Sequence, residues 1–156
     1  MRITLLVVGK TLKGWIKDGL DIYAGRLVHY VRFEIKEIPE LKNAASLSKD
    51  EIKQREGELI LKSLKPEDKV ILLDERGQMP SSMQMAAKMS ELLQQGRNVV
   101  YVVGGAYGFS PAVYDRAEGK LSLSRMTFSH QMIRVIFVEQ LYRAFTIISG
   151  EPYHHE

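Results

Sequence analysis

The sequence predicts an α/β fold in which a mostly parallel sheet is flanked by helices. Two observations support this prediction. Short apolar runs of strand length alternate with longer segments whose apolar residues recur at helical spacing. The alternation continues through nearly the whole chain, which favours strand–helix–strand units and therefore parallel strands. The length of 156 residues suits one hydrophobic core, so we expect residues 1–156 to form a single domain.

Three strands and two helices are expected in the first half of the chain. The strands are residues 4–8, 31–38 and 70–73, and the helices are residues 15–27 and 48–64. Apolar and polar side chains alternate in the second strand, which predicts one solvent-exposed face and an end at Pro39. Ser48 and Glu51 form a capping box that starts the second helix. Residues 74–78 are polar and are expected to form a turn.

The second half of the chain is expected to contain three helices and two strands. The helices are residues 81–96, 111–117 and 130–148, and the strands are residues 99–103 and 120–124. Gly96 ends the first of these helices. Ser110 followed by Pro111 is a favourable start for the second helix, because serine caps the free amides and proline suits the first helical position. Residues 125–129 are expected to form a loop.

The last predicted helix is apolar on two flanks. His130 and Arg134 lie on one side of its helical wheel, and Glu139 and Arg143 lie nearly opposite. The flanks between them contain Ile133, Phe137, Leu141, Tyr142, Phe145 and Ile148. A helix with two apolar flanks needs two partners. One is its own sheet, and we expect the other to be a second copy of the chain, so the sequence predicts a homodimer through this helix.

The composition excludes several classes of site. The chain has no cysteine, which excludes disulfides, iron–sulfur clusters and thiol nucleophiles. Its four histidines are not spaced for a shared ion, so we expect no metal. The apolar runs are too short for a signal-peptide core or a membrane span, which predicts a cytoplasmic protein without a membrane partner. The net charge of +3 permits a nucleic-acid partner without identifying one.

The best candidate for a ligand site in the residue pattern is the Gly-Gly-Ala-Tyr-Gly segment at residues 104–108. It follows a buried strand, and open α/β sheets bind ligands at the carboxyl ends of their strands. Glycines also let the backbone approach a ligand closely. A tight connection without a ligand explains the pattern equally well. After the first strand, neither a phosphate-binding P-loop nor a G-x-G-x-x-G fingerprint is present.

A second segment that follows a strand, residues 123–130, offers backbone groups, hydroxyls and the cation of Arg125. It contains no nucleophile with a recognisable base, and Ser129 is expected to cap the last helix. In that helix, Glu139 and Arg143 are four residues apart and are expected to form an ion pair. Their place in an apolar helix favours a role beyond that of a surface ion pair.

Several segments together resemble the RlmH family, which are bacterial ribosomal RNA large-subunit methyltransferases of the SPOUT class. The C-terminal part of the resemblance consists of residues 128–134 (FSHQMIR), 138–145 (VEQLYRAF) and 150–154 (GEPYH). The remaining matches are residues 7–10, 55–57 and 103–108. The resemblance spans essentially the whole chain, and the C-terminal combination is specific.

The resemblance implies a fold, a reaction and partners. The fold would be a SPOUT-type α/β sheet with a deep trefoil knot near the C-terminus, and the working unit would be a homodimer. The reaction would transfer a methyl group from S-adenosylmethionine to N3 of a pseudouridine in the helix 69 loop of 23S rRNA, within the assembled 70S ribosome. The implied cofactor-binding residues are Leu73, Gly104, Leu123, Ser124, Arg125, Met126, Thr127 and Phe128. Ser129 stands where relatives often have proline.

The implied reaction needs a group that removes the imide proton or stabilises the resulting anion. The candidates are His130, Arg134, Glu139, Arg143, Tyr153 and His154. We favour Arg143 with the tail residues Tyr153 and His154, and expect Glu139 to orient Arg143. A tail that only contacts RNA phosphates is the alternative. Two other functions remain open at this point: a small nucleotide-binding α/β enzyme, and a non-catalytic ribosome-associated factor.

Overall fold

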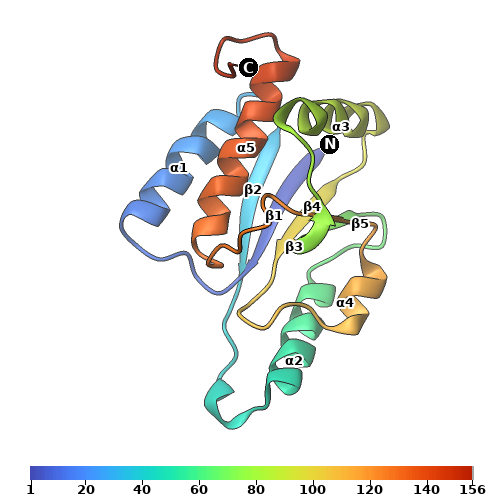
Figure 1. Ribbon diagram of the computed structural model, residues 1–156. Helices are drawn as coiled ribbons and strands as arrows, with labels where there is room; N and C mark the ends of the chain where they lie inside the picture. The colour runs from blue at the N-terminus through green and yellow to red at the C-terminus, as the bar shows by residue number, and fades with distance from the viewer. Residues whose placement is uncertain (156) are drawn as a thin grey trace.

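The computed structural model describes residues 1–155 and contains a five-stranded, all-parallel sheet in the order β2-β1-β4-β3-β5 (Figure 1). The strands are β1 (Arg2–Val8), β2 (Arg32–Ile38), β3 (Lys69–Gln78), β4 (Val99–Val103) and β5 (Gly119–Leu121). The helices are α1 (Trp15–Leu27), α2 (Lys49–Lys62), α3 (Ser82–Gln95), α4 (Pro111–Arg116) and α5 (Met132–Ile148), with a short 3₁₀ turn at Ala44–Ser46. The predicted α/β class with a parallel sheet is confirmed.

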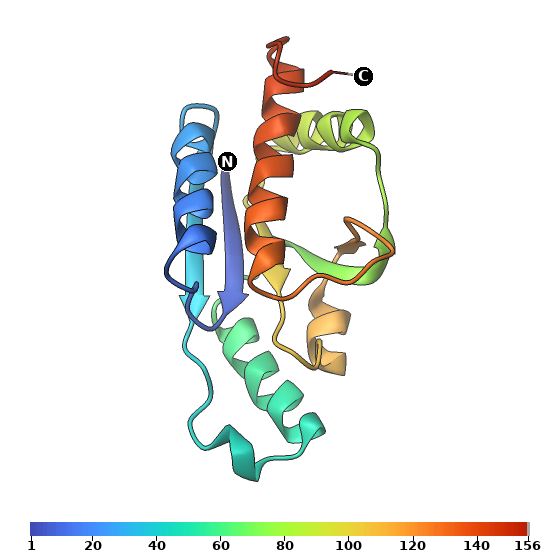
Figure 2. The same cartoon turned by 60° about the vertical axis from the view of Figure 1, so that its left-hand side comes forward.

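Helices cover both faces of the sheet. Helices α1, α5 and α3 lie on one face and helices α2 and α4 on the other (Figures 1 and 2). Each face has its own apolar core, since successive residues of a strand point to opposite faces. In β1, for example, Leu5 belongs to the core under α5 and Leu6 to the core under α2. Central strands buried on both faces are typical of parallel sheets.

The helix ends that the sequence predicts are confirmed where a cap is encoded locally. Ser48 and Ser81 each accept a backbone hydrogen bond from the residue three positions on, at 3.1 and 3.2 Å, and both capping boxes are complete. Gly96 ends α3 with a φ of 69°, a conformation that favours glycine. The predicted cap of the last helix differs: the side-chain oxygen of Ser129 accepts from the amide of Met132 at 3.1 Å in the turn that leads into α5, while the N-cap position is Gln131, which makes no side-chain cap.

The predicted turn at residues 74–78 is wrong. The segment continues β3, which runs for ten residues from Lys69 to Gln78. Its extension is stabilised by β5, although the register shifts between Leu73 and Gln78. A Cβ on Gly77 would lie 2.6 Å from the backbone of Leu121, so the close approach of the two chain segments requires glycine there. The polar residues at the carboxyl end of β3 therefore reflect the solvent exposure of this part of the strand rather than a turn.

Strand β5 and helix α5 are both shorter than predicted, because a side-chain hydrogen bond to the backbone lies at the boundary of each. Strand β5 ends at Leu121 rather than at residue 124, because the hydroxyl of Ser122 donates to the carbonyl of Ser124 at 2.8 Å and turns the chain away from the sheet. Helix α5 begins at Met132 rather than at residue 130. The carbonyl of His130 accepts from the side chain of Arg134 at 3.0 Å, and that side chain takes the place of a helical backbone donor.

Helix α5 packs on the sheet between α1 and α3 (Figure 2). Part of its apolar surface is therefore covered by its own chain, and the homodimer stays a prediction. The knot that the resemblance implies also stays a prediction. In the part of the chain that the structure describes, no helix is both long and apolar enough to cross a membrane.

Candidate functional site

A cavity of about 820 Å³ lies at the carboxyl ends of β3, β4 and β5, and we refer to it as the strand-end cavity. Seven of the eight predicted cofactor-binding residues line it: Leu73, Gly104, Leu123, Ser124, Met126, Thr127 and Phe128. Arg125 is outside the lining, as its neighbours in the loop face the cavity instead. The structure thus brings together three segments that are far apart in the sequence, because parallel strands end at the same edge of the sheet.

The glycine segment forms one wall of the cavity. A Cβ on Gly104 would lie 3.0 Å from the ring of Phe109, so glycine lets β4 end directly against that ring. Gly108 has a φ of 82°, a conformation that other residues rarely adopt. Ser110, capping α4 as predicted, anchors the segment at its far end. The backbone of this wall is accordingly fixed close to the cavity.

The opposite wall is the loop that follows β5. The hydroxyl of Ser124 accepts from the amide of Met126 at 2.9 Å and holds the loop in a tight turn. Met126 is 77% exposed and Phe128 is 37% exposed, although both are large and apolar. Exposed apolar side chains beside a cavity are typical of a surface that a ligand or another chain covers.

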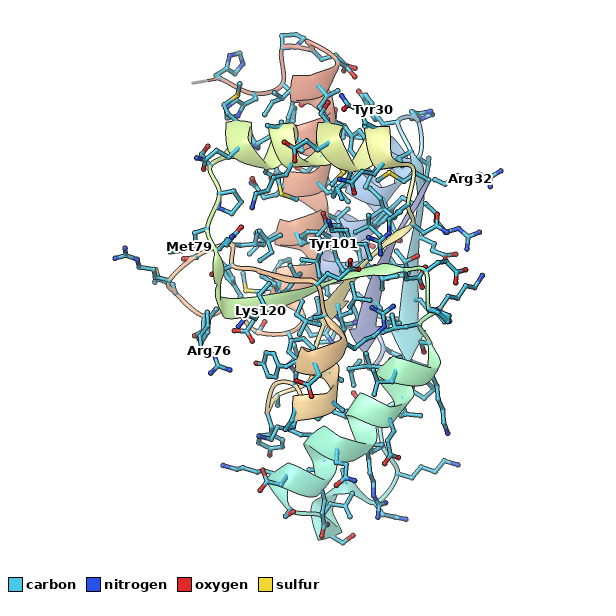
Figure 3. All side chains as sticks on the ribbon, turned by 90° about the vertical axis from the view of Figure 1, so that its right-hand side faces the viewer. Tyr30, Arg32, Arg76, Met79, Tyr101 and Lys120 are labelled. Atoms are coloured by element: carbon cyan, nitrogen blue, oxygen red, sulfur yellow. The ribbon has the colours of Figure 1, made fainter. Side chains whose placement is uncertain are left out.

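An ionised carboxylate lines the cavity beside Leu73. Asp74 accepts hydrogen bonds from the hydroxyl of Tyr114 and from the amide of Arg76. Burial raises the pKa of Asp74, but these two bonds and the charge of Arg76 outweigh it, so the pKa lies below its usual value. Figure 3 shows Arg76 beside Lys120, and both cations lie 5.6 Å from the ring centre of Tyr114. No sequence pattern indicates this group, because Asp74 and Tyr114 are 40 residues apart.

A second carboxylate lies behind the glycine wall. Oε1 of Glu56 is buried and has no hydrogen-bond partner among the described residues, and both carboxylate oxygens lie 2.6 Å from where a Cβ on Gly105 would be. Burial raises the pKa of Glu56, and the nearby charge of Glu40 adds to the effect. The sequence carries one signal for this contact, the Glu56-Gly57 pair on the face of α2 that packs against the segment leading into α4.

Of the six candidate catalytic residues, Arg134 is buried in the fold and lines no cavity, and the other five divide into two sets. His130 lines the strand-end cavity, next to the start of α5. Glu139, Arg143, Tyr153 and His154 form a compact group of their own, which we call the Arg143 cluster. Arg143 donates to Glu139 at 2.5 Å and to Nδ1 of His154 at 3.1 Å. Because a guanidinium only donates, Nδ1 of His154 is the acceptor.

The Arg143 cluster is held together by polar and aromatic contacts. The hydroxyl of Tyr153 donates to Glu139 at 2.8 Å, and its ring lies 4.9 Å below the guanidinium of Arg143. The ring of Tyr142 packs edge-on against Tyr153 at 4.8 Å. Burial raises the pKa of Tyr153, and its hydrogen bonds with Glu139 and Tyr23 add to the shift. At neutral pH the Tyr153 hydroxyl is therefore a hydrogen-bond donor and not a base.

The Arg143 cluster and the cavity lie apart in one chain. No cluster residue lines the cavity, and Arg143 follows the cavity residue Ile133 by ten positions, which is about 15 Å along a helix. The C-terminal tail lies at the same end of the molecule as the N-terminus, where the strands begin (Figures 1 and 2). Within residues 1–155, no three histidine, aspartate or glutamate side chains are grouped to hold a metal ion.

Comparisons with known proteins identify close relatives. A family model described as "Predicted SPOUT methyltransferase" matches residues 1–154. Curated proteins named Ribosomal RNA large subunit methyltransferase H align over all of this chain and all of their own length: 52% identical from Parabacteroides distasonis, 50% from Bacteroides fragilis and 46% from Flavobacterium johnsoniae. A solved structure of a putative RNA methyltransferase of the TrmH family from Porphyromonas gingivalis is 15% identical, with a TM-score of 0.42 over 89% of this chain and 58% of that one.

Proposed function

This chain belongs to the RlmH family of SPOUT methyltransferases, and on that basis we propose that it methylates N3 of a pseudouridine in the helix 69 loop of 23S rRNA, within the assembled 70S ribosome, with S-adenosylmethionine as the methyl donor. The observation that carries the proposal is the strand-end cavity, in which Leu73, Gly104 and the loop after β5 converge.

The residues of the cavity fit the methyl donor. Its volume of about 820 Å³ lies in the usual range for small-molecule sites, and its walls combine apolar side chains with strand-end backbone groups. The apolar walls suit the adenine ring, and the backbone of residues 104–105 and 122–124 suits its polar edges. Asp74 is ionised and lines the same cavity, which favours a cationic ligand over a neutral one. When bound, S-adenosylmethionine supplies an electrophilic methyl group on a sulfonium.

The chain's own contribution to the reaction is positioning and charge. The displacement needs no covalent enzyme intermediate, which agrees with the absence of cysteine from the sequence. The target nitrogen loses its proton to water, and the cation of Arg143 favours this loss because it stabilises the resulting anion. Glu139 and Tyr153 fix the guanidinium in place, and His154 accepts one of its N–H groups. His130 lines the cavity from the side of α5, where it contacts the incoming base.

A homodimer joins the two sets of residues. In one chain the Arg143 cluster is about 15 Å along α5 from the cavity, too far for both to contact one base. If two copies pack through α5 in antiparallel orientation, two-fold symmetry places the end of one α5 beside the start of the other. The exposed Met132 and Ile148 near the two ends of α5 support that contact. The tail of one copy then completes the cavity of its partner.

The proposed RNA partner has consequences for RNA affinity, for cellular location and for the role of the C-terminal tail. The net charge of +3 is small, so we expect weak binding to isolated RNA that falls with salt, and a ribosomal substrate that supplies additional surface. An enzyme that acts on assembled ribosomes works in the cytoplasm. In the alternative, the tail only contacts RNA phosphates. Tail variants would then lose affinity for the ribosome, while the methylation rate of the bound complex would stay unchanged.

Two measurements test the proposal. Calorimetric titration with S-adenosylmethionine should give saturable binding, and methyl transfer should occur to 70S ribosomes. Absence of binding would favour a non-catalytic ribosome-associated factor, and binding of a flavin or nucleotide in its place would favour the small-molecule enzyme. Single-turnover assays of Arg143→Ala, Tyr153→Phe and His154→Ala test the catalytic assignment, and wild-type rates for all three would contradict it.

A further inference from the structure

Arg134 is a completely buried cation. Its side chain is 0% exposed and is the largest fully buried side chain of residues 1–155. The nearest carboxylate oxygen, on Glu37, is 3.9 Å away, beyond hydrogen-bond distance. A buried charge is costly unless its hydrogen bonds are made, so the contacts of this guanidinium identify what it does.

Arg134 holds the end of strand β1. Its two terminal nitrogens donate to the carbonyl of Val8 at 2.9 Å and to the carbonyl of Gly9 at 3.0 Å. The hydroxyl of Thr11 accepts a further bond at 3.0 Å. Both carbonyls lie at the carboxyl edge of the sheet, and the guanidinium donates a hydrogen bond to each of them. The planar fork of arginine reaches the two consecutive carbonyls at once, which a lysine ammonium does not do with the same geometry.

The position that Arg134 fills is one where open α/β sheets usually bind a ligand. After β1 the chain continues to β2, toward one edge of the sheet, and after β4 it continues to β5, toward the opposite edge. Because the connections of these two neighbouring strands run in opposite directions, the crevice between β1 and β4 is the topological switch point. The strand-end cavity lies to one side of it, at β4, β3 and β5, and neither Val8 nor Gly9 lines it. Arg134 closes the crevice next to the cavity.

The same side chain is connected to the cavity wall. Its Nε donates to the carbonyl of His130 at 3.0 Å, and His130 lines the cavity. That carbonyl lies where the loop after β5 enters α5. The loop is fixed at its other end by the hydrogen bond from the amide of Ser122 to the carbonyl of Gln78, at 2.8 Å, and between these two anchors residues 125–129 are exposed.

We propose that Arg134 is a positioning residue, which anchors the cavity-lining loop of residues 123–130 to the end of β1 and so sets the shape of the methyl-donor site. The proposal rests on the proposed function only in taking the strand-end cavity as that site. It assigns Arg134 no contact with the donor or with RNA, since the side chain is completely buried and four of its five N–H groups bond to three backbone carbonyls and the hydroxyl of Thr11. The expected consequence is that residues 9–11, which do not line the cavity, respond when the cavity is filled.

The test compares Arg134→Met, Arg134→Lys and Gln131→Ala with the wild type. Methionine keeps the length and removes all N–H groups, and lysine keeps the charge without the fork. Gln131 is the matched control: its side chain also bonds to the loop after β1, at the amide of Leu12 (2.9 Å) and the carbonyl of Lys10 (3.0 Å), but makes no hydrogen bond to the carbonyl of His130. Affinity for S-adenosylmethionine is measured by calorimetry, and amide hydrogen exchange is measured for residues 123–131.

Arg134→Met should weaken the affinity by about tenfold or more, Arg134→Lys by less, and Gln131→Ala by no more than about twofold. Exchange in residues 123–131 should become faster in the Met variant while that of α3 stays unchanged, which a general loss of stability would not produce. Wild-type affinity in a folded Met variant overturns the proposal, as does faster exchange spread evenly over the chain.

The wild type provides a test that does not depend on a variant that folds. Saturation with S-adenosylmethionine should slow exchange at the amides of Gly9 and Thr11, which contact Arg134 and do not line the cavity. No change there, with clear protection of residues 123–128, overturns the proposal and leaves the proposed function standing. A wild-type chain that binds no S-adenosylmethionine contradicts the proposed function itself.

Discussion

The strand-end cavity and the Arg143 cluster are built on opposite principles. The cavity consists of backbone at the ends of strands and of apolar side chains such as Met126 that remain exposed. In the Arg143 cluster each polar side chain has a partner within the same chain. The first is shaped to take up a ligand, and the second is preorganised before any ligand arrives. In the proposed reaction, binding of the donor and activation of the target should therefore be separable, and variants should affect one without the other.

The largest expected effect is on the Arg143 cluster. Arg143→Ala should lower the single-turnover rate of methylation by about 10²- to 10³-fold, because the stabilising cation is lost. Affinity for S-adenosylmethionine should stay within about twofold, because Arg143 lies outside the cavity. Arg32→Ala is the control, an arginine that extends from the edge of the sheet into solvent (Figure 3). An equal loss of donor affinity would remove the distinction between the two regions.

The second-largest effect is expected on affinity for the methyl donor, through a change in the cavity. Thr127→Trp places an indole in the cavity and should weaken affinity for S-adenosylmethionine by about 100-fold or more, which is about 2.7 kcal/mol. Glu67→Trp, on an exposed turn away from the cavity, adds the same bulk and should change affinity little. Calorimetry measures both. If the two variants bind alike, the cavity is not the donor site.

A smaller loss of methylation rate is expected when a single hydrogen bond of the Arg143 cluster is removed. Tyr153→Phe removes the donor to Glu139 and keeps the ring that packs on Tyr142. The methylation rate should fall by about tenfold, and the free energy of unfolding by about 1 kcal/mol. The dimer and donor affinity should be unaffected. A loss of ribosome binding with an unchanged rate in the bound complex would instead assign the tail to RNA contact.

The smallest effect concerns the cavity wall and depends on pH. The pKa of Asp74 is lowered in the folded chain, so its ionised form stabilises the fold above the unfolded value of about 3.9 and the contribution is lost as the pH falls through the folded value. Tyr114→Phe removes a donor to this carboxylate and should cost about 1 kcal/mol at neutral pH. Urea unfolding should show a smaller difference at pH 3. An equal difference at both pH values would contradict the assignment.

Local signals were enough to predict most elements of the fold. The capping boxes at Ser48 and Ser81 fix helix starts, because the partners lie three residues apart in the sequence. The strands of the centre of the sheet follow from their apolar runs. The convergence of Leu73, Gly104 and the loop after β5 also follows, once the strands are parallel, since their carboxyl ends share one edge.

Contacts between distant residues decided the rest. The extension of β3 depends on β5, and the ionisation of Asp74 depends on Tyr114. In both cases the deciding partner is remote in the sequence, so no spacing pattern records it. The sequence by itself determined the α/β class and the caps of α2, α3 and α4, and its resemblance to the family indicated seven of the residues that line the cavity. Only the tertiary structure joined Glu139 and Arg143 to the tail residues and placed this group at the opposite end of α5 from the cavity, because these contacts link chain segments whose arrangement no spacing pattern records.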